Sequence, residues 1–194
     1  MGKGRLEAFS DGVIAIIITI MVLELRPPEH AGLDALRPLI PVFLSYLLSF
    51  INIGIYWNNH HHMLQAAKSV SGAVLWANLH LLFWLSLFPF VTGWIGESPM
   101  SSTSAAIYGG VAMMAAVAYT ILSMVIIRHE GPGSTLAQAT GKDWKGWGSL
   151  ACYVAAIPLA FVSPLIAYAL FVVVAGIWFL PDRRIERVIA AAED

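Results

Sequence analysis

The first apolar segment of this chain begins and ends on carboxylates. Only twelve uncharged residues separate Asp11 from Glu24. At about 1.5 Å of rise per residue, a helix over this stretch is roughly 18 Å long, whereas a lipid-facing helix must cross about 30 Å of hydrocarbon. We therefore predict that neighbouring protein shields this helix from lipid. Because ionisable residues within a membrane often mark a path for ions or substrates, the segment predicts a central, pathway-forming helix.

The composition is that of an all-α integral membrane protein. Hydrophobic residues make up 58% of the chain and charged residues 12%, against about 25% charged residues in soluble domains. The first apolar run is followed by Glu24, Arg26 and two prolines rather than by a small-residue cleavage site, so we expect the first helix to be retained.

Charge and cysteine content narrow the function further. The net charge of −1 gives no indication of nucleic-acid binding. Cys152 is the single cysteine, which excludes an intrachain disulfide and a metal site built on several thiolates. We expect no cofactor, and the lipid bilayer and further copies of the chain as partners.

Polar and turn-rich breaks divide the chain into six apolar segments, which we interpret as six transmembrane helices of one membrane domain over residues 1–194. The last two are separated only by Ser163 and Pro164, so a single tilted span is the alternative. Six spans place most basic residues on the cytoplasmic side, as the positive-inside rule expects, with both termini cytoplasmic and only Arg26 and Arg37 outside. The predicted spans lie near residues 5–25, 36–62, 69–95, 103–128, 144–162 and 164–182. The predicted cytoplasmic basic residues are Lys3, Arg5, Lys68, Arg128, Lys142, Lys145, Arg183, Arg184 and Arg187.

Arg5 lies four residues before Phe9-Ser10-Asp11, and an isoleucine-rich helix follows. This pattern resembles the signature of the transmembrane protein 175 family, which comprises the potassium channels of endosomes and lysosomes and their prokaryotic relatives. A chain with a single six-helix repeat, by this resemblance, forms a homotetramer whose pore is lined by the first helix. The resemblance implies that K⁺ permeates without a Thr-Val-Gly-Tyr-Gly carbonyl filter, which this sequence also lacks.

The resemblance also assigns residues within the first helix. It places the pore constriction at Ile16, a contribution to selectivity at Thr19 and a further aliphatic ring at Leu23. On a helical wheel centred on Ile16, Leu23 lies about 20° away, Ile20 about 40° and Thr19 about 60°, so the four residues form one stripe. Four copies around an axis would form a hydrophobic constriction that gates by dewetting. The alternative is that the stripe packs in the core, as most aliphatic stripes do.

Ser10 and Asp11 lie about 120° and 140° from this stripe, on opposite sides. We therefore expect both side chains to contact neighbouring helices. Arg5 is poorly placed to pair with Asp11 on the same helix, which predicts a partner for Asp11 on another helix or subunit, since a buried carboxylate needs one. The alternative is that Asp11 senses protons or concentrates cations at the cytoplasmic mouth.

Three histidines, His60, His61 and His62, end the second predicted span. Adjacent side chains on a helix point about 100° apart, so these imidazoles cannot converge on one ion, and we predict no metal site. Instead we expect a structural polar network in which His60 or His61, with Asn78 and His80, satisfies Ser10, Asp11 and Arg5. The resemblance also implies a polar network behind the first helix.

Two function classes remain. The first is a homotetrameric, potassium-permeable cation channel in the cell membrane. The second is a proton-coupled or cation-coupled secondary transporter, in which Asp11, Glu24 and the histidines would carry protons; the absence of an internal sequence repeat disfavours it. We do not expect an enzyme, because the sequence lacks His-Glu-x-x-His, Gly-x-Ser-x-Gly and dinucleotide-binding glycine patterns.

Overall fold

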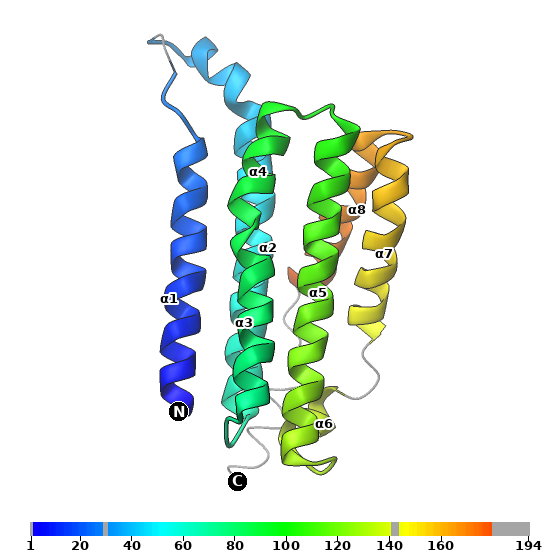
Figure 1. The fold of residues 1–194 in the computed structure, drawn as a ribbon. Helices are drawn as coiled ribbons and strands as arrows, with labels where there is room; N and C mark the ends of the chain where they lie inside the picture. Colours follow the sequence, from blue (N-terminus) through cyan, green and yellow to red (C-terminus); the bar gives the residue numbers. More distant parts are fainter. Residues whose placement is uncertain (1, 29–30, 141–143, 180–194) are drawn as a thin grey trace.

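The computed structural model describes residues 2–28, 31–140 and 144–179. Within these ranges the chain is a bundle of helices that run alternately up and down (Figure 1). The helices are α1 (Lys3–Met21), α2 (Ile40–Ala66), α3 (Gly72–Ser86), α4 (Phe88–Glu97), α5 (Ser102–Glu130), α6 (Thr135–Thr140), α7 (Trp144–Ala160) and α8 (Pro164–Phe179), with short 3₁₀ segments at Val22–Glu24 and Leu33–Leu39.

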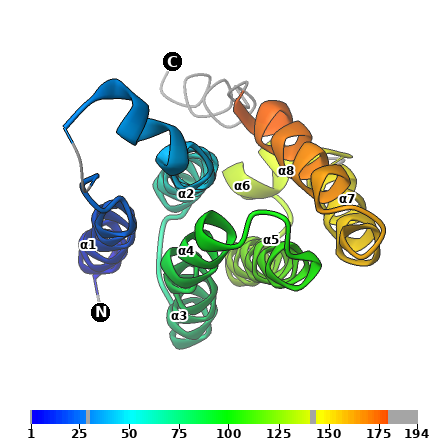
Figure 2. The same cartoon turned by 90° about the horizontal axis from the view of Figure 1, so that it is seen from above.

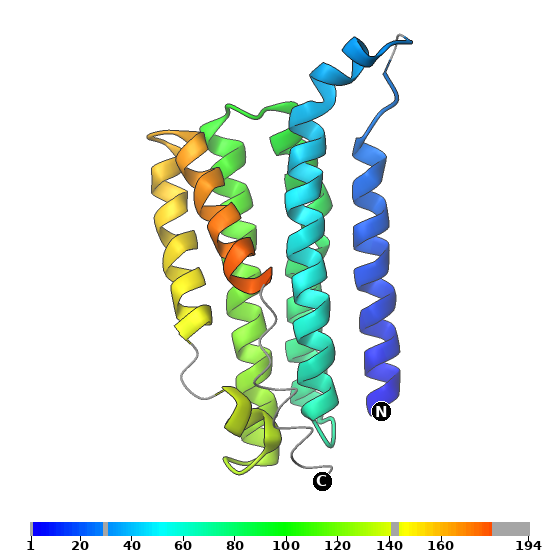
Figure 3. The same cartoon turned by 180° about the vertical axis from the view of Figure 1, so that it is seen from behind.

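Four helical segments of the described chain are long and apolar enough to cross a membrane: Lys3–Glu24, Leu33–Ala66, Gly72–Glu97 and Ser102–Glu130. They overlap the first four predicted spans. The shorter helices α7 and α8 are joined by a turn at residues 161–163 and pack against each other as a hairpin (Figure 3). The end of the last predicted span, residues 180–182, lies outside the described residues, as do Lys142, Arg183, Arg184 and Arg187.

The third predicted span, 69–95, is not one continuous helix. The structure divides it at Leu87 into α3 and α4, and Pro89 occupies the first turn of α4. Proline has no backbone N–H to donate, so the helical hydrogen-bond ladder cannot continue through this position. The N–H of Leu87 instead bonds to the carbonyl of Trp84, three residues back, at 3.3 Å.

The end of α5 holds the turn between α2 and α3. Glu130 Oε1 accepts hydrogen bonds from the backbone N–H groups of Lys68 and Ser69. The Ser69 hydroxyl also lies 3.1 Å from Nε2 of His129. These contacts fix one end of α3 relative to α5.

Helix α1 lies at one edge of the bundle, against α2, α3 and α4, while α7 and α8 lie on the far side (Figure 2). Its buried residues recur every three or four positions, the spacing of one helical face. The buried face consists of Leu6, Ser10, Ile14, Ile17 and Met21. The opposite face of α1 has no partner among the described residues of this chain.

Candidate functional site

The predicted aliphatic stripe lies on the uncovered face of α1, and its last residue, Leu23, lies in the 3₁₀ segment that follows the helix. The exposed fractions of Ile16, Ile20 and Leu23 are 58%, 44% and 73%, and Thr19 is also exposed. Core packing within this chain therefore does not account for the stripe. The Thr19 hydroxyl lies 3.0 Å from the carbonyl oxygens of Ala15 and Ile16, so its hydrogen is engaged by the helix backbone.

A buried chain of hydrogen bonds ties the other face of α1 to its neighbours. Asn78 on α3 donates from Nδ2 to Ser10 Oγ at 2.9 Å, and its Oδ1 lies 2.7 Å from Nε2 of His60 on α2. The Ser10 hydroxyl donates in turn to the carbonyl of Leu6 at 2.9 Å. All three linked side chains are at most 1% exposed. Of the two histidines left open by the sequence, His60 is the one that joins Ser10.

Asp11 has a partner that the sequence did not indicate. Trp57 on α2 donates from Nε1 to Asp11 Oδ1 at 3.0 Å. The ring of His61 stacks on Trp57, with 6.2 Å between ring centroids and 26° between planes. Ser10 and Asp11 thus point to different neighbours, Ser10 to α3 and Asp11 to α2, as their positions on the helical wheel indicate.

Two predicted members of the network lie elsewhere. His80 accepts a hydrogen bond from Nε1 of Trp84, one turn further along α3, at 3.0 Å. It lies two residues after Asn78, about 200° around the helix, so it cannot share the face that Asn78 turns toward α1. Arg5 is exposed, and among the described residues it makes no hydrogen bond or ion pair with Asp11 or with either histidine.

Just beyond the C-terminal end of α1, a side chain makes a close approach that the sequence did not reveal. Glu24 packs against α4 at Gly93, where a Cβ added to the glycine would lie 2.9 Å from the Glu24 carboxylate. A larger residue at this position would require the end of the Glu24 side chain to shift. Glycine is common in membrane helices, so its presence alone did not mark this position.

The run of His60, His61 and His62 raises the question of a metal site. No group of three or more His, Cys, Asp or Glu residues within the described part of the chain is arranged to hold a metal ion.

A family model described as the endosomal/lysosomal potassium channel TMEM175 matches residues 5–89 of this chain. A potassium channel of Chryseobacterium sp. (strain P1-3) is 55% identical over 187 residues, which cover 96% of this chain and 97% of that protein. The chain belongs to the TMEM175 family. All of the candidate site residues, from Arg5 to His80, lie within the part matched by the TMEM175 family.

Comparison of structures agrees with this membership. The crystal structure of a lysosomal potassium-selective channel TMEM175 homolog from Chamaesiphon minutus superposes with a TM-score of 0.80 and 30% sequence identity, covering 93% of this chain and 97% of that one. A human relative, named endosomal/lysosomal proton channel TMEM175, is 33% identical over 96 residues, or 43% of this chain and 19% of that protein. The TMEM175 fold is therefore a helical membrane fold shared with channels.

Proposed function

We propose that this protein is the subunit of a homotetrameric, potassium-permeable cation channel of the cell membrane, with both termini cytoplasmic. The bacterial relatives are named as potassium channels, and the structural neighbour is titled potassium-selective. The observation that carries the proposal is the exposed aliphatic stripe on α1, opposite a face that hydrogen bonds hold against α2 and α3.

The surroundings of the stripe favour a pore over a lipid-facing surface. Asp11 and Glu24 bracket a helix segment of roughly 18 Å, shorter than the hydrocarbon thickness of about 30 Å. Lipid along this stretch would draw both carboxylates into the hydrocarbon region, even though Asp11 is bonded to α2 and Glu24 packs against α4, at a cost of several kcal/mol. Four copies of α1 around an axis cover the face and leave the stripe lining a central path.

Side chains then determine what permeates. Ile16 forms the narrowest ring in this proposal, with Ile20 and Leu23 as further aliphatic rings that close the path when water leaves them. At Thr19 the hydroxyl hydrogen is engaged by backbone carbonyls, so the lone pairs on the oxygen are the groups offered to a passing cation. A ring of such oxygens replaces part of the hydration shell of K⁺.

The proposed membrane topology uses six crossing segments: α1, α2, α3 with α4, α5, α7 and α8. Together they form one membrane domain. This arrangement puts the N-terminus on the same side as the α2–α3 turn and helix α6.

Bi-ionic current recording tests this proposal. Purified protein in liposomes, with K⁺ on one side and Na⁺ on the other, should give a reversal potential that favours K⁺. Ile16→Asn widens and wets the constriction, so we expect a larger current with a smaller preference for K⁺. Ile107→Asn, at an exposed α5 position (43%) away from α1, is the matched control and should leave the reversal potential unchanged.

Two results would contradict the proposal. An Ile16→Asn protein with the reversal potential and current of the wild type would remove Ile16 from the conduction path. Slow, saturating uptake coupled to a second ion gradient, with no current above that of empty liposomes, would identify a transporter instead.

A further inference from the structure

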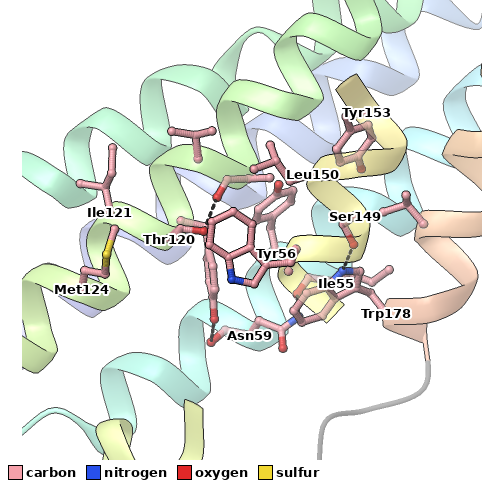
Figure 4. A pocket seen from close by; sticks show the side chains of 16 residues that line it. Ile55, Tyr56, Asn59, Thr120, Ile121, Met124, Ser149, Leu150, Tyr153 and Trp178 are labelled. Atoms are coloured by element: carbon pink, nitrogen blue, oxygen red, sulfur yellow. Dashed lines mark hydrogen bonds between the residues drawn. The ribbon is translucent and has the colours of Figure 1, made fainter. Parts of the chain in front are cut away.

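A crevice far from α1 opens between α2, α5, α7 and α8. It has a volume of about 230 Å³, and Figure 4 shows the side chains that line it. Its wall is made of aliphatic and aromatic side chains with a few neutral polar groups, and no residue that lines it carries a charge. Trp147 and Met124, on its rim, are 73% and 45% exposed, so the crevice is open toward the surroundings of the bundle.

Several polar groups of the wall already have protein partners. Tyr119 donates to the backbone carbonyl of Asn59 at 3.3 Å. Trp178 donates from Nε1 to Ser149 Oγ at 2.7 Å, and Ser149 donates to the carbonyl of Lys145 at 2.8 Å. These groups shape the wall and leave little hydrogen-bonding capacity for a ligand.

Two tyrosines of the same wall differ from them. Tyr56 on α2 and Tyr153 on α7 both line the crevice (Figure 4), and neither hydroxyl makes a hydrogen bond with any described residue. Tyr153 is only 4% exposed. Neither hydroxyl oxygen is among the buried, unpaired side-chain atoms of the described residues, so both stay accessible from the crevice that they line. Both hydroxyls are therefore free to donate to a molecule in the crevice.

The size and chemistry of the crevice indicate which kind of ligand it fits. A single water needs about 10–15 Å³ of such volume, so the crevice holds far more than one water and approaches the size of a small-ligand pocket. No lining residue carries a charge that would pair with a charged ligand, and the nearby Lys145 Nζ lies over the Trp178 ring, 5.8 Å from its centroid. A neutral ligand therefore fits this lining better than an ion does. Aromatic walls, including Trp147 and Trp178, suit a flat apolar ligand.

We propose that this crevice binds a neutral, largely apolar molecule from the bilayer through an acceptor oxygen, such as that of a ketone, that receives hydrogen bonds from Tyr56 and Tyr153. The site does not depend on the proposed ion conduction. Its α2 wall includes Tyr56 and Asn59. Each of them directly precedes a residue of the contacts that hold α1: Trp57 follows Tyr56, and His60 follows Asn59.

Photolabelling of the wild-type protein in liposomes with benzophenone, a neutral aromatic ketone, tests the proposal. On irradiation, benzophenone inserts into nearby C–H bonds, and mass spectrometry locates the adducts. We expect saturable labelling of peptides from α2, α5 and α7 that line the crevice. The double variant Tyr56→Phe with Tyr153→Phe should raise the half-saturating concentration by about tenfold, because each hydrogen bond accounts for a few-fold in affinity. Tyr168→Phe is the matched control, since the Tyr168 hydroxyl donates to the carbonyl of Pro99 instead.

A pair of competitors separates hydrogen bonding from simple apolar filling. Fluorenone and fluorene have nearly the same shape, but only fluorenone has an acceptor oxygen. Fluorenone should displace benzophenone at a concentration about tenfold lower than fluorene does. Equal displacement by the two compounds, equal labelling of the double tyrosine variant, or no saturable labelling of the wild type would each overturn the proposal. Thr120→Trp, which fills the crevice from an exposed position, should abolish labelling, and persistent labelling of that variant would place the ligand elsewhere.

Discussion

Asn78→Leu should loosen α1 from the bundle, because Asn78 is the link between α1, α2 and α3. It is fully buried and bonds Ser10 at 2.9 Å and His60 at 2.7 Å. Leucine has a similar volume, so the change removes two hydrogen bonds without leaving a large cavity. After the substitution, Ser10 still donates to the carbonyl of Leu6, whereas the ring nitrogen of His60 loses its partner.

The expected cost follows from measurements on similar bonds. In soluble proteins each buried group left unpaired costs about 1–3 kcal/mol, but interhelical hydrogen bonds in membrane proteins average about 0.6 and reach about 1.7 kcal/mol. Removing two such hydrogen bonds in a membrane protein is therefore expected to lower the free energy of unfolding by about 1–3 kcal/mol. For a chain of this size, that loss lowers the unfolding temperature by roughly 2–12 °C.

The single cysteine provides the assay. Cys152 is half-buried on α7, so a maleimide dye that fluoresces on reaction with the thiol reports unfolding as the purified protein is heated. Asn58→Leu is the matched control, because Asn58 makes no hydrogen bond with the described residues. An Asn78→Leu protein that unfolds within about 1 °C of the Asn58→Leu protein would refute the view that this hydrogen-bond chain holds α1.

Two further substitutions test other contacts. Gly96→Ala should destabilise the protein by about 1–3 kcal/mol, because the added Cβ would lie 3.0 Å from the backbone of α2. Gly110→Ala is the control: its Cβ would meet open space, so it should be neutral or stabilising in the same thermal assay. Equal effects of the two substitutions would contradict the close approach of α4 to α2 at Gly96. Glu130→Ala should speed hydrogen exchange of the amides of Lys68 and Ser69 by about 10–100-fold, since it removes a charged acceptor worth about 1.5–3 kcal/mol. Unchanged exchange at those amides, measured by mass spectrometry, would show that Glu130 does not hold the turn.

Hydrophobic patterning located the helices well, because runs of apolar residues between polar breaks are dictated by the bilayer itself. It did not separate α3 from α4, since apolar residues continue through the break at Leu87. Pro89 was the available signal, and its missing N–H is the physical cause. The turn at residues 161–163 was signalled in the same way by Pro164.

The directions in which the α1 side chains point could be predicted from the sequence, but their partners on other helices could not. One helical wheel suffices to separate Ser10 and Asp11 from the stripe, because that depends only on the rotation per residue. Choosing between His60 and His61 also requires knowing which face of α2 meets α1, and the sequence does not contain that rotation. His80 is different, because Trp84 lies four residues later on the same helix, and this spacing marks a local partner.

Thiol modification at Leu23 tests the central claim, that the uncovered face of α1 lines the conduction path. Leu23 is 73% exposed in the 3₁₀ segment that follows α1, and the Leu23→Cys, Cys152→Ser protein offers one thiol at that position. A small, water-soluble, cationic methanethiosulfonate should modify it and block most of the K⁺ current, with mass spectrometry confirming the adduct. A modified protein that conducts as before, or a thiol that the reagent cannot reach while current flows, would contradict the account.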